Sequence, residues 1–198
     1  MTLRHQNHTA GKTVDPPFSS PTALLLIDLI SDFEFEDGEK LWNNARPLGE
    51  PIARLLSRAR QGGIPVIYVN DNFGKWQEDL EKQVERILYS SGMGRELLEK
   101  IRPSAQDLYV LKPQRSVFYE TPLSVLLAAI GVETLILTGV TTDICVLFSA
   151  HDAYMRGFDI FVPSDCTAAV ESEYKQDALT LLERVAKADL RLSDDLEI

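Results

Sequence analysis

The chain has 198 residues, of which 44% are hydrophobic and 25% are charged, an ordinary composition for a soluble globular domain. Its 20 lysine and arginine residues against 30 aspartate and glutamate residues give a formal net charge of −10. This excess of acid argues against DNA, RNA or an anionic membrane surface as the main partner. No apolar run reaches the ~18 residues that a membrane-spanning helix needs. We therefore expect no nucleic acid and no membrane among the partners.

The length favours a single domain. Residues 1–20 are polar and contain Pro16 and Pro17, so we expect a flexible N-terminal extension and one domain over 21–198. The extension lacks the apolar stretch of a secretory signal. Cys145 and Cys166 are the only cysteines, which is too few for a disulfide framework. Reduced thiols and a cytoplasmic location are the expectation.

Short apolar runs alternate with amphipathic segments along the chain. The run at 23–27 is apolar throughout, which is typical of a strand buried on both faces. Further strands are expected at 65–69, 108–111, 134–138 and 160–162, with a short sixth strand at 190–192. Helices are expected at 46–61, 77–100 with an interruption at 90–94, 122–130, 142–156 and 172–188. This alternation predicts an α/β fold of three α-β-α layers around a mainly parallel sheet.

Residues with reactive side chains follow the expected strands directly. Asp28 comes after the first strand, Asn70 to Asn72 after the second, and Lys112 after the third. Gly139 to Thr141 follow the fourth strand, and Cys145 lies in the first turn of the next helix. In such sheets ligands bind at the carboxyl ends of the strands. We therefore expect an acid, a base and a thiol to converge at one rim.

These three groups fit together chemically. A thiol is a weak nucleophile until it becomes a thiolate; a helix N-terminus and a nearby ammonium favour the thiolate, and a carboxylate can take the proton. His151 is the competing base, but six helical residues separate its side chain from Cys145 by about 120° and about 9 Å. Asp28 is therefore the preferred base. A structural role for each residue remains the alternative, because helical cysteines are often buried small apolar side chains.

Three blocks carry a resemblance to a known family. The segments LLLIDLISDF, LKPQRSVFYETPL and LILTGVTTDICVLFSAHDAYMRGFDIFVPSDCTAA resemble the isochorismatase-like cysteine hydrolases, which include nicotinamidases and related amidases, over about Ala23 to Ala188. The resemblance implies a six-stranded parallel sheet of Rossmann-like topology. It also implies a catalytic triad of Asp28, Lys112 and Cys145, with Lys112 holding Asp28 and the thiolate charged. A non-proline cis peptide bond would join Val140 to Thr141 and turn backbone N–H groups toward an oxyanion.

The implied function is hydrolysis of a small-molecule amide or related C–N bond through a thioester on Cys145. One alternative is vinyl-ether cleavage of the isochorismatase type, which does not need the thiol. Another is a non-catalytic member that binds a metabolite or a partner protein. The family usually forms dimers or tetramers, so we expect a homodimer or homotetramer.

The loops that supply a metal site in nicotinamidases differ here. Those enzymes use an Asp-x-His pair and a further histidine after the second strand, whereas residues 32–42 and 70–76 contain no histidine. We therefore expect no metal and no other cofactor. Asp71 is read as part of a polar turn rather than as a cation ligand.

Several side chains near the strand ends are candidates for contacts with the substrate. Aromatic residues in loops at an active rim suit an apolar substrate wall, although they are as often core residues. The candidates are Phe33, Asn72, Trp76 and Phe118. Arg115 could pair with a substrate carboxylate, with a solvated surface arginine as the plainer interpretation.

Overall fold

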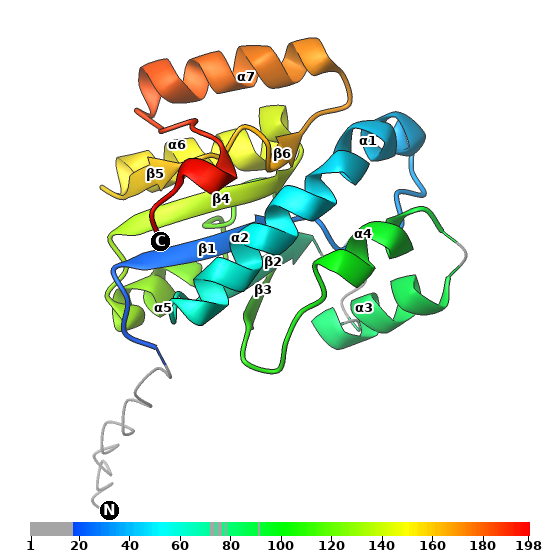
Figure 1. Cartoon of the computed structure of the whole chain (residues 1–198), viewed down its shortest axis with the longest axis horizontal. Helices are drawn as coiled ribbons and strands as arrows, with labels where there is room; N and C mark the ends of the chain where they lie inside the picture. The colour runs from blue at the N-terminus through cyan, green and yellow to red at the C-terminus, as the bar shows by residue number, and fades with distance from the viewer. Residues whose placement is uncertain (1–17, 72–73, 75–76, 78, 91) are drawn as a thin grey trace, which may run out of the picture.

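A computed structural model describes residues 18–71, 74, 77, 79–90 and 92–198. The expected extension over 1–20 therefore falls almost entirely outside the described residues. Figure 1 shows a central sheet with helices packed on its two faces. Its strands are β1 Thr22–Ile27, β2 Val66–Asp71, β3 Leu108–Lys112, β4 Thr134–Val140, β5 Asp159–Phe161 and β6 Thr167–Ala168. They lie in the order β3-β2-β1-β4-β5, with β6 paired to β4, and every pairing is parallel.

The helices form the two outer layers. They are α1 Gly38–Ala45, α2 Gly49–Gln61, α3 Leu80–Tyr89, α4 Gly94–Lys100, α5 Leu123–Ile130, α6 Leu147–Met155 and α7 Ser172–Val185. Short 3-10 turns occupy Arg46–Leu48 and Ser193–Asp195, and one π-helical turn occupies Thr142–Val146. No helix in the described parts of the chain is both long enough and apolar enough to cross a membrane.

Strand β1 explains why the sheet is covered on both sides. Leu24 and Leu26 belong to a core formed with helices α1 to α4. Leu25 and Ile27 point to the other face and belong to a second core formed with α5, α6 and α7. Successive side chains of a strand alternate between the two faces of the sheet. A strand that is apolar at every position therefore needs helices packed on both faces. The expected α/β fold with three layers and six strands is confirmed.

The sixth strand is not where the sequence placed it. Residues 190–192 form no strand; the only ladder contact near them is a single bridge between Asp189 and Phe161. The Asp189 carboxylate accepts a hydrogen bond from the backbone N–H of Arg191 at 3.0 Å, and such a local turn competes with strand pairing. Thr167–Ala168 takes the sixth place instead, beside the end of β4.

The register of the central strands sets the edge where the site lies. Ile27, the last residue of β1, is paired with Gly139 of β4, and Asp71 of β2 is paired with Lys112 of β3. Gly139 has a φ of +118°, and a Cβ there would lie 2.0 Å from the Ile27 carbonyl oxygen. Glycine at this position therefore lets β4 approach β1 closely just before the loop that leads to Cys145.

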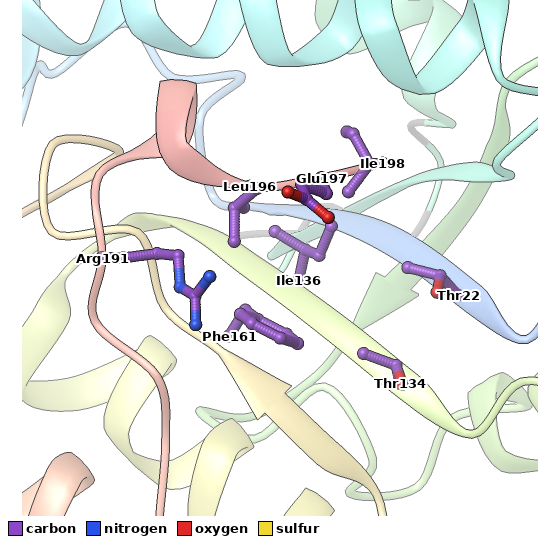
Figure 2. A pocket seen from close by; sticks show the side chains of 8 residues that line it. All are labelled: Thr22, Thr134, Ile136, Phe161, Arg191, Leu196, Glu197 and Ile198. Carbon is purple, nitrogen blue, oxygen red and sulfur yellow. The ribbon is translucent and has the colours of Figure 1, made fainter.

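A cavity of about 280 Å³ lies at the opposite end of the strands, under the C-terminal segment. Figure 2 shows that it is lined by the first residues of β1 and β4 and by the C-terminus. Its one arginine, Arg191, is ion-paired with Asp189 at 2.5 Å and lies over the Phe161 ring at 5.8 Å. None of its described lining residues is a nucleophile with an adjacent base. The reactive groups lie at the other edge.

Candidate active site

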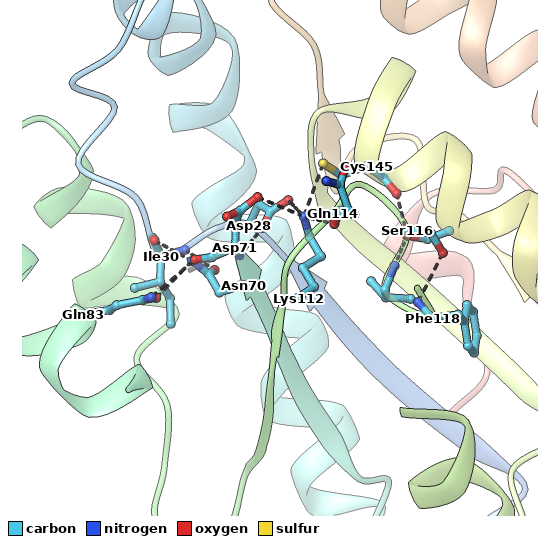
Figure 3. Close-up of polar contacts among 12 residues, drawn as sticks. Asp28, Ile30, Asn70, Asp71, Gln83, Lys112, Gln114, Ser116, Phe118 and Cys145 are labelled. Atoms are coloured by element: carbon cyan, nitrogen blue, oxygen red, sulfur yellow. Dashed lines mark hydrogen bonds and ion pairs between the residues drawn. The ribbon is translucent and has the colours of Figure 1, made fainter. Parts of the chain in front are cut away.

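Asp28 is the first residue after β1 and turns the chain sharply, with a φ of +53°. Its Oδ1 accepts a hydrogen bond from the backbone N–H of Asp71 at 2.8 Å. Its Oδ2 lies 2.8 Å from the Nζ of Lys112. Asp71 of β2 and Lys112 of β3 therefore hold one carboxylate oxygen of Asp28 each (Figure 3).

Lys112 ends β3, and its side chain has no solvent exposure. Besides Asp28, its Nζ donates to the Gln114 carbonyl oxygen at 3.1 Å and lies 3.8 Å from Oδ2 of Asp71. It also lies 3.6 Å from the Sγ of Cys145. A lysine is fully buried only where acceptors and counter-charges surround it, and here they do. Figure 3 shows this ammonium between the Asp28 carboxylate and the Cys145 sulfur.

Cys145 lies in the π-helical turn Thr142–Val146 that precedes α6. Single π-helical turns are rare and often occur at functional sites. The Cys145 carbonyl oxygen accepts a hydrogen bond from Ser149 Oγ at 2.6 Å, which ties the turn to α6. The thiol is partly buried and belongs to no disulfide. The structure thus brings together Asp28, Lys112 and Cys145 from three separate segments.

The pKa values show how these groups share protons. Burial raises the pKa of the Asp28 carboxyl, and the ammonium of Lys112 reverses only part of that rise. Burial by itself lowers the pKa of Lys112, but the charges of Asp28 and Cys145 outweigh it and hold that pKa above its ordinary value. Burial and then the Asp28 charge raise the pKa of the Cys145 thiol to about 12, against the lowering effect of Lys112.

Burial and the Asp28 charge therefore disfavour a standing thiolate on Cys145, whereas Lys112 favours one. Lys112 lowers the pKa of both Asp28 and Cys145, the direction expected of a cation that favours their charged forms. A buried carboxylate with a raised pKa is a stronger base than an exposed one. The arrangement favours transfer of the Cys145 proton to Asp28 during attack over a standing thiolate.

The peptide bond between Val140 and Thr141 is cis, at the position that the resemblance indicated. The Thr141 carbonyl oxygen accepts backbone hydrogen bonds from Ile144 at 3.2 Å and from Val146 at 3.1 Å. These contacts close the turn that carries Cys145. The Thr141 side-chain oxygen is buried with no hydrogen-bond partner among the residues that the structure describes.

A pocket of about 390 Å³ opens above Asp28 and Cys145, a size suited to a small molecule. Apolar side chains provide most of its wall. It is lined by Asp28, Ser31, Phe33, Phe35, Leu41, Asp71, Arg115, Val140, Thr141, Ile144, Cys145 and Val170. The reactive groups therefore face a cavity rather than bulk water.

The candidates for substrate contacts have different outcomes. Phe33 lines the pocket. Phe118 does not: it is 4% exposed, stacks on Phe158 with ring centroids 5.9 Å apart, and lies under the guanidinium of Arg156 at 4.8 Å. The prediction for Phe118 is wrong because its loop folds over α6 and directs the ring into the core. Asn72 and Trp76 lie outside the described residues.

Sequence reasoning missed several lining residues. Leu41 comes from α1, a helix that the sequence did not predict, and Val170 comes from the loop after β6. Phe35 follows Phe33 by two residues and is 47% exposed, an unusual exposure for phenylalanine. The two rings lie 6.3 Å apart. The Phe-x-Phe spacing could have indicated that Phe33 and Phe35 line the same wall of the pocket.

Two further candidates have other contacts. The side chain of His151 bonds to the carbonyl oxygen of Leu147 through Nδ1 at 2.8 Å, so that nitrogen carries a proton and faces its own helix. Asp32, in the 32–42 segment that contains no histidine, is ion-paired with Arg86. Among the described residues no group of three or more His, Cys, Asp or Glu side chains is placed to hold a metal ion.

Comparisons with known proteins place the chain among similar sequences and structures. A family model described as the isochorismatase domain matches residues 22–189. The uncharacterised isochorismatase family protein YaaI of Bacillus subtilis (strain 168) is 38% identical over 174 residues, covering 88% of this chain and 95% of that protein. The ureidoacrylate amidohydrolase RutB of Methylorubrum extorquens is 30% identical over 141 residues, covering 61% of this chain and 57% of that protein.

Two solved structures of amidases are also similar to this chain. The N-carbamoylsarcosine amidase from Thermoplasma acidophilum is 29% identical with a TM-score of 0.68, covering 90% of this chain and 100% of that chain. The pyrazinamidase/nicotinamidase from Streptococcus mutans UA159 is 29% identical with a TM-score of 0.66, covering 85% of this chain and 99% of that chain. With the family model matching most of its length, the chain belongs to the isochorismatase family.

Proposed function

We propose that this protein hydrolyses a small amide, or a related C–N bond such as that of a ureide, with Cys145 as nucleophile. The observation that carries the proposal is the position of the Lys112 ammonium, 2.8 Å from the Asp28 carboxylate and 3.6 Å from the Cys145 sulfur. This places a base and a cation beside a thiol at the floor of a pocket. The names of the similar amidases and amidohydrolase support the reaction class.

The reaction proceeds in two balanced steps. Asp28 takes the thiol proton as Sγ of Cys145 attacks the carbonyl carbon, and the C–N bond then breaks as Asp28 gives that proton to the leaving nitrogen. Asp28 next takes a proton from water, which attacks the thioester. The C–S bond breaks, the acid leaves, and the proton returns to Cys145.

Lys112 and two backbone N–H groups stabilise the negative charge that develops during the reaction. Lys112 offsets the negative charge on sulfur and carboxylate while the proton moves. We assign the backbone N–H groups of Thr141 and Cys145 to the carbonyl oxygen as it becomes an oxyanion, since both residues line the pocket. Donors aimed at that oxygen contribute about 10²–10³-fold to the rate of acyl-transfer enzymes.

Trapping the acyl group tests the proposal. A panel of small amides, ureides and isochorismate is incubated with the wild type, and hydroxylamine is added to compete with water for the thioester. We expect a hydroxamate from at least one amide or a hydroxyurea from at least one ureide, loss of turnover in Cys145→Ala, and retained turnover in the control Cys166→Ala. Cys166 is also a buried thiol, but it does not line the pocket.

Two outcomes would contradict the proposal. Cleavage of isochorismate that survives Cys145→Ala would favour the vinyl-ether reaction. Saturable binding of a panel compound without turnover by the wild type would favour a non-catalytic binding protein.

A further inference from the structure

Arg115 is an exposed cation at the pocket with no counter-charge among the residues that the structure describes. It lines the pocket beside Cys145 and is exposed. In the described part of the chain its side chain makes no hydrogen bond and no ion pair. By contrast, Arg86 and Arg191 each contact a carboxylate, and Lys112 contacts two. Arg115 is therefore available to an incoming anion.

The backbone on both sides of Arg115 is fixed relative to the nucleophile. Before it, the Gln114 carbonyl oxygen accepts a hydrogen bond from Nζ of Lys112 at 3.1 Å. After it, Ser116 Oγ donates to Asp152 of α6 at 2.8 Å, and Figure 3 shows this loop passing beside Cys145. A free guanidinium on an anchored loop loses little backbone freedom when it binds a ligand.

The rest of the pocket makes this cation the natural partner of an anion. The acids at the floor, Asp28 and Asp71, would repel an anionic ligand, but Lys112 lies within 4 Å of both. The walls near Phe33 and Phe35 are apolar and weaken the screening of a charge pair by water. An arginine binds a carboxylate through two parallel hydrogen bonds, which fixes orientation as well as charge.

We propose that Arg115 binds a carboxylate of the substrate, and that the protein therefore acts on small amides that carry a carboxylate close to the scissile carbonyl. Arg115 is here a specificity-determining residue, because it touches the substrate away from the reacting atoms. The inference rests on the proposed function for its reaction, but its charge recognition can be measured separately.

Two alkylating reagents of nearly equal size provide the test. Iodoacetate carries a carboxylate and iodoacetamide carries a neutral amide, so the ratio of their rates at Cys145 reports recognition of the anion. The ratio is measured by peptide mapping in the wild type, Arg115→Gln and Arg115→Lys. The matched control is Arg184→Ala, which removes an exposed arginine on α7 that does not line the pocket.

We expect Arg115→Gln to lower the iodoacetate to iodoacetamide ratio by about tenfold, the scale of one charge-assisted pair. Arg115→Lys keeps the charge but loses the bidentate geometry, so its ratio should lie between those of wild type and Arg115→Gln. Added salt should reduce the wild-type ratio. An equal ratio in the wild type and Arg115→Gln would overturn the inference.

A second measurement separates this inference from the proposed function. Succinate and its neutral counterpart succinamide are compared for their effect on the melting temperature, since a ligand that binds the folded state stabilises it. We expect stabilisation by succinate that is lost in Arg115→Gln. If neither reagent labels Cys145, the proposed nucleophile is wrong, and the shift in melting temperature alone tests the anion site. Equal shifts with succinate and succinamide, or equal succinate shifts in the wild type and Arg115→Gln, would overturn the anion site.

Discussion

Replacing Lys112 by methionine removes the cation on which the proposed chemistry depends while keeping a long side chain. The substitution leaves the Asp28 carboxylate with its hydrogen bond from Asp71 but without its counter-charge at 2.8 Å. It also removes the cation 3.6 Å from Sγ of Cys145. Because Lys112 has no solvent exposure, water cannot simply take its place.

The geometry gives the size of the effect. Two unit charges 2.8 Å apart attract each other by roughly 6 kcal/mol at an effective dielectric constant of about 20. Only part of this is a net contribution, because burying the ammonium costs free energy. If about 3 kcal/mol is lost from the transition state, the rate falls by about 10²-fold. We therefore expect at least this loss of amide hydrolysis in Lys112→Met.

The assay is the pH dependence of Cys145 alkylation by iodoacetamide. Burial already raises the pKa of this thiol to about 12, and loss of the ammonium should raise it further, so the Lys112→Met curve should be displaced to higher pH. Lys187→Met is the control, since Lys187 is exposed and donates only to the Arg184 carbonyl oxygen. Superimposable curves for wild type and Lys112→Met would remove Lys112 from the mechanism.

The same variant has a pH-dependent stability whose sign follows from Asp28. Burial raises the folded-state pKa of Asp28, and Lys112 now opposes that rise; without Lys112 the folded-state pKa must be higher still. Below the unfolded-state pKa the carboxyl is neutral in both states and carries no penalty. Up to the folded-state pKa of the wild type, Asp28 stays protonated in both folded proteins, so the loss of unfolding free energy in Lys112→Met relative to the wild type should grow as the pH rises through that pKa. Chemical denaturation at acidic and neutral pH measures it.

Three further predictions concern the whole molecule. Brief alkylation followed by peptide mapping should label Cys145 before Cys166, which is 0% exposed; the reverse order would overturn the assignment of the nucleophile. Elemental analysis should find less than one transition metal ion per chain, and activity should survive a chelator; a stoichiometric metal whose removal abolishes activity would contradict this. Light scattering should show a homodimer or homotetramer, since α6 exposes Phe148 and Met155 at 54% and 78%; a particle of 22.2 kDa would contradict it.

The sheet and the reactive residues could be predicted because their signals are local. The run before Asp28 is apolar at every position, which only a strand covered on both faces requires. Parallel strands then place the residues after them on one edge, so Asp28 and Lys112 were expected at the same edge; in the sheet, β2 lies between their strands. Cys145 follows from the same argument one helical turn later.

Other features depend on contacts between distant segments. Helix α1 has only three apolar residues, so its apolar stripe is short. Asp37 stands at its N-cap position and Glu39 in its first turn, but Asp37 has a φ of +62° and its side chain makes no cap hydrogen bond. Leu41 was missed as a pocket residue because it lies on this helix. Phe118 could not be placed from its position after a strand, because the bond from Ser116 to Asp152 folds its loop over α6. The pairing of Thr167 with Gly139 likewise needs β4 already in place.

The raised pKa of Asp28 leads to a final prediction about the acidic side of the pH–rate profile. Hydrolysis needs the carboxylate as base, so activity is lost as the pH falls through the pKa of Asp28. Burial holds this pKa above the ordinary value of 3.8, and the acidic limb should lie correspondingly higher. Asp28→Asn keeps the shape but removes the base, so it should lower the rate by at least about 10²-fold and abolish the limb. Asp194→Asn removes a carboxylate that pairs with Arg54 at the surface and serves as the control. A limb that persists in Asp28→Asn would assign the titration to another group and leave the Cys145 proton without its acceptor.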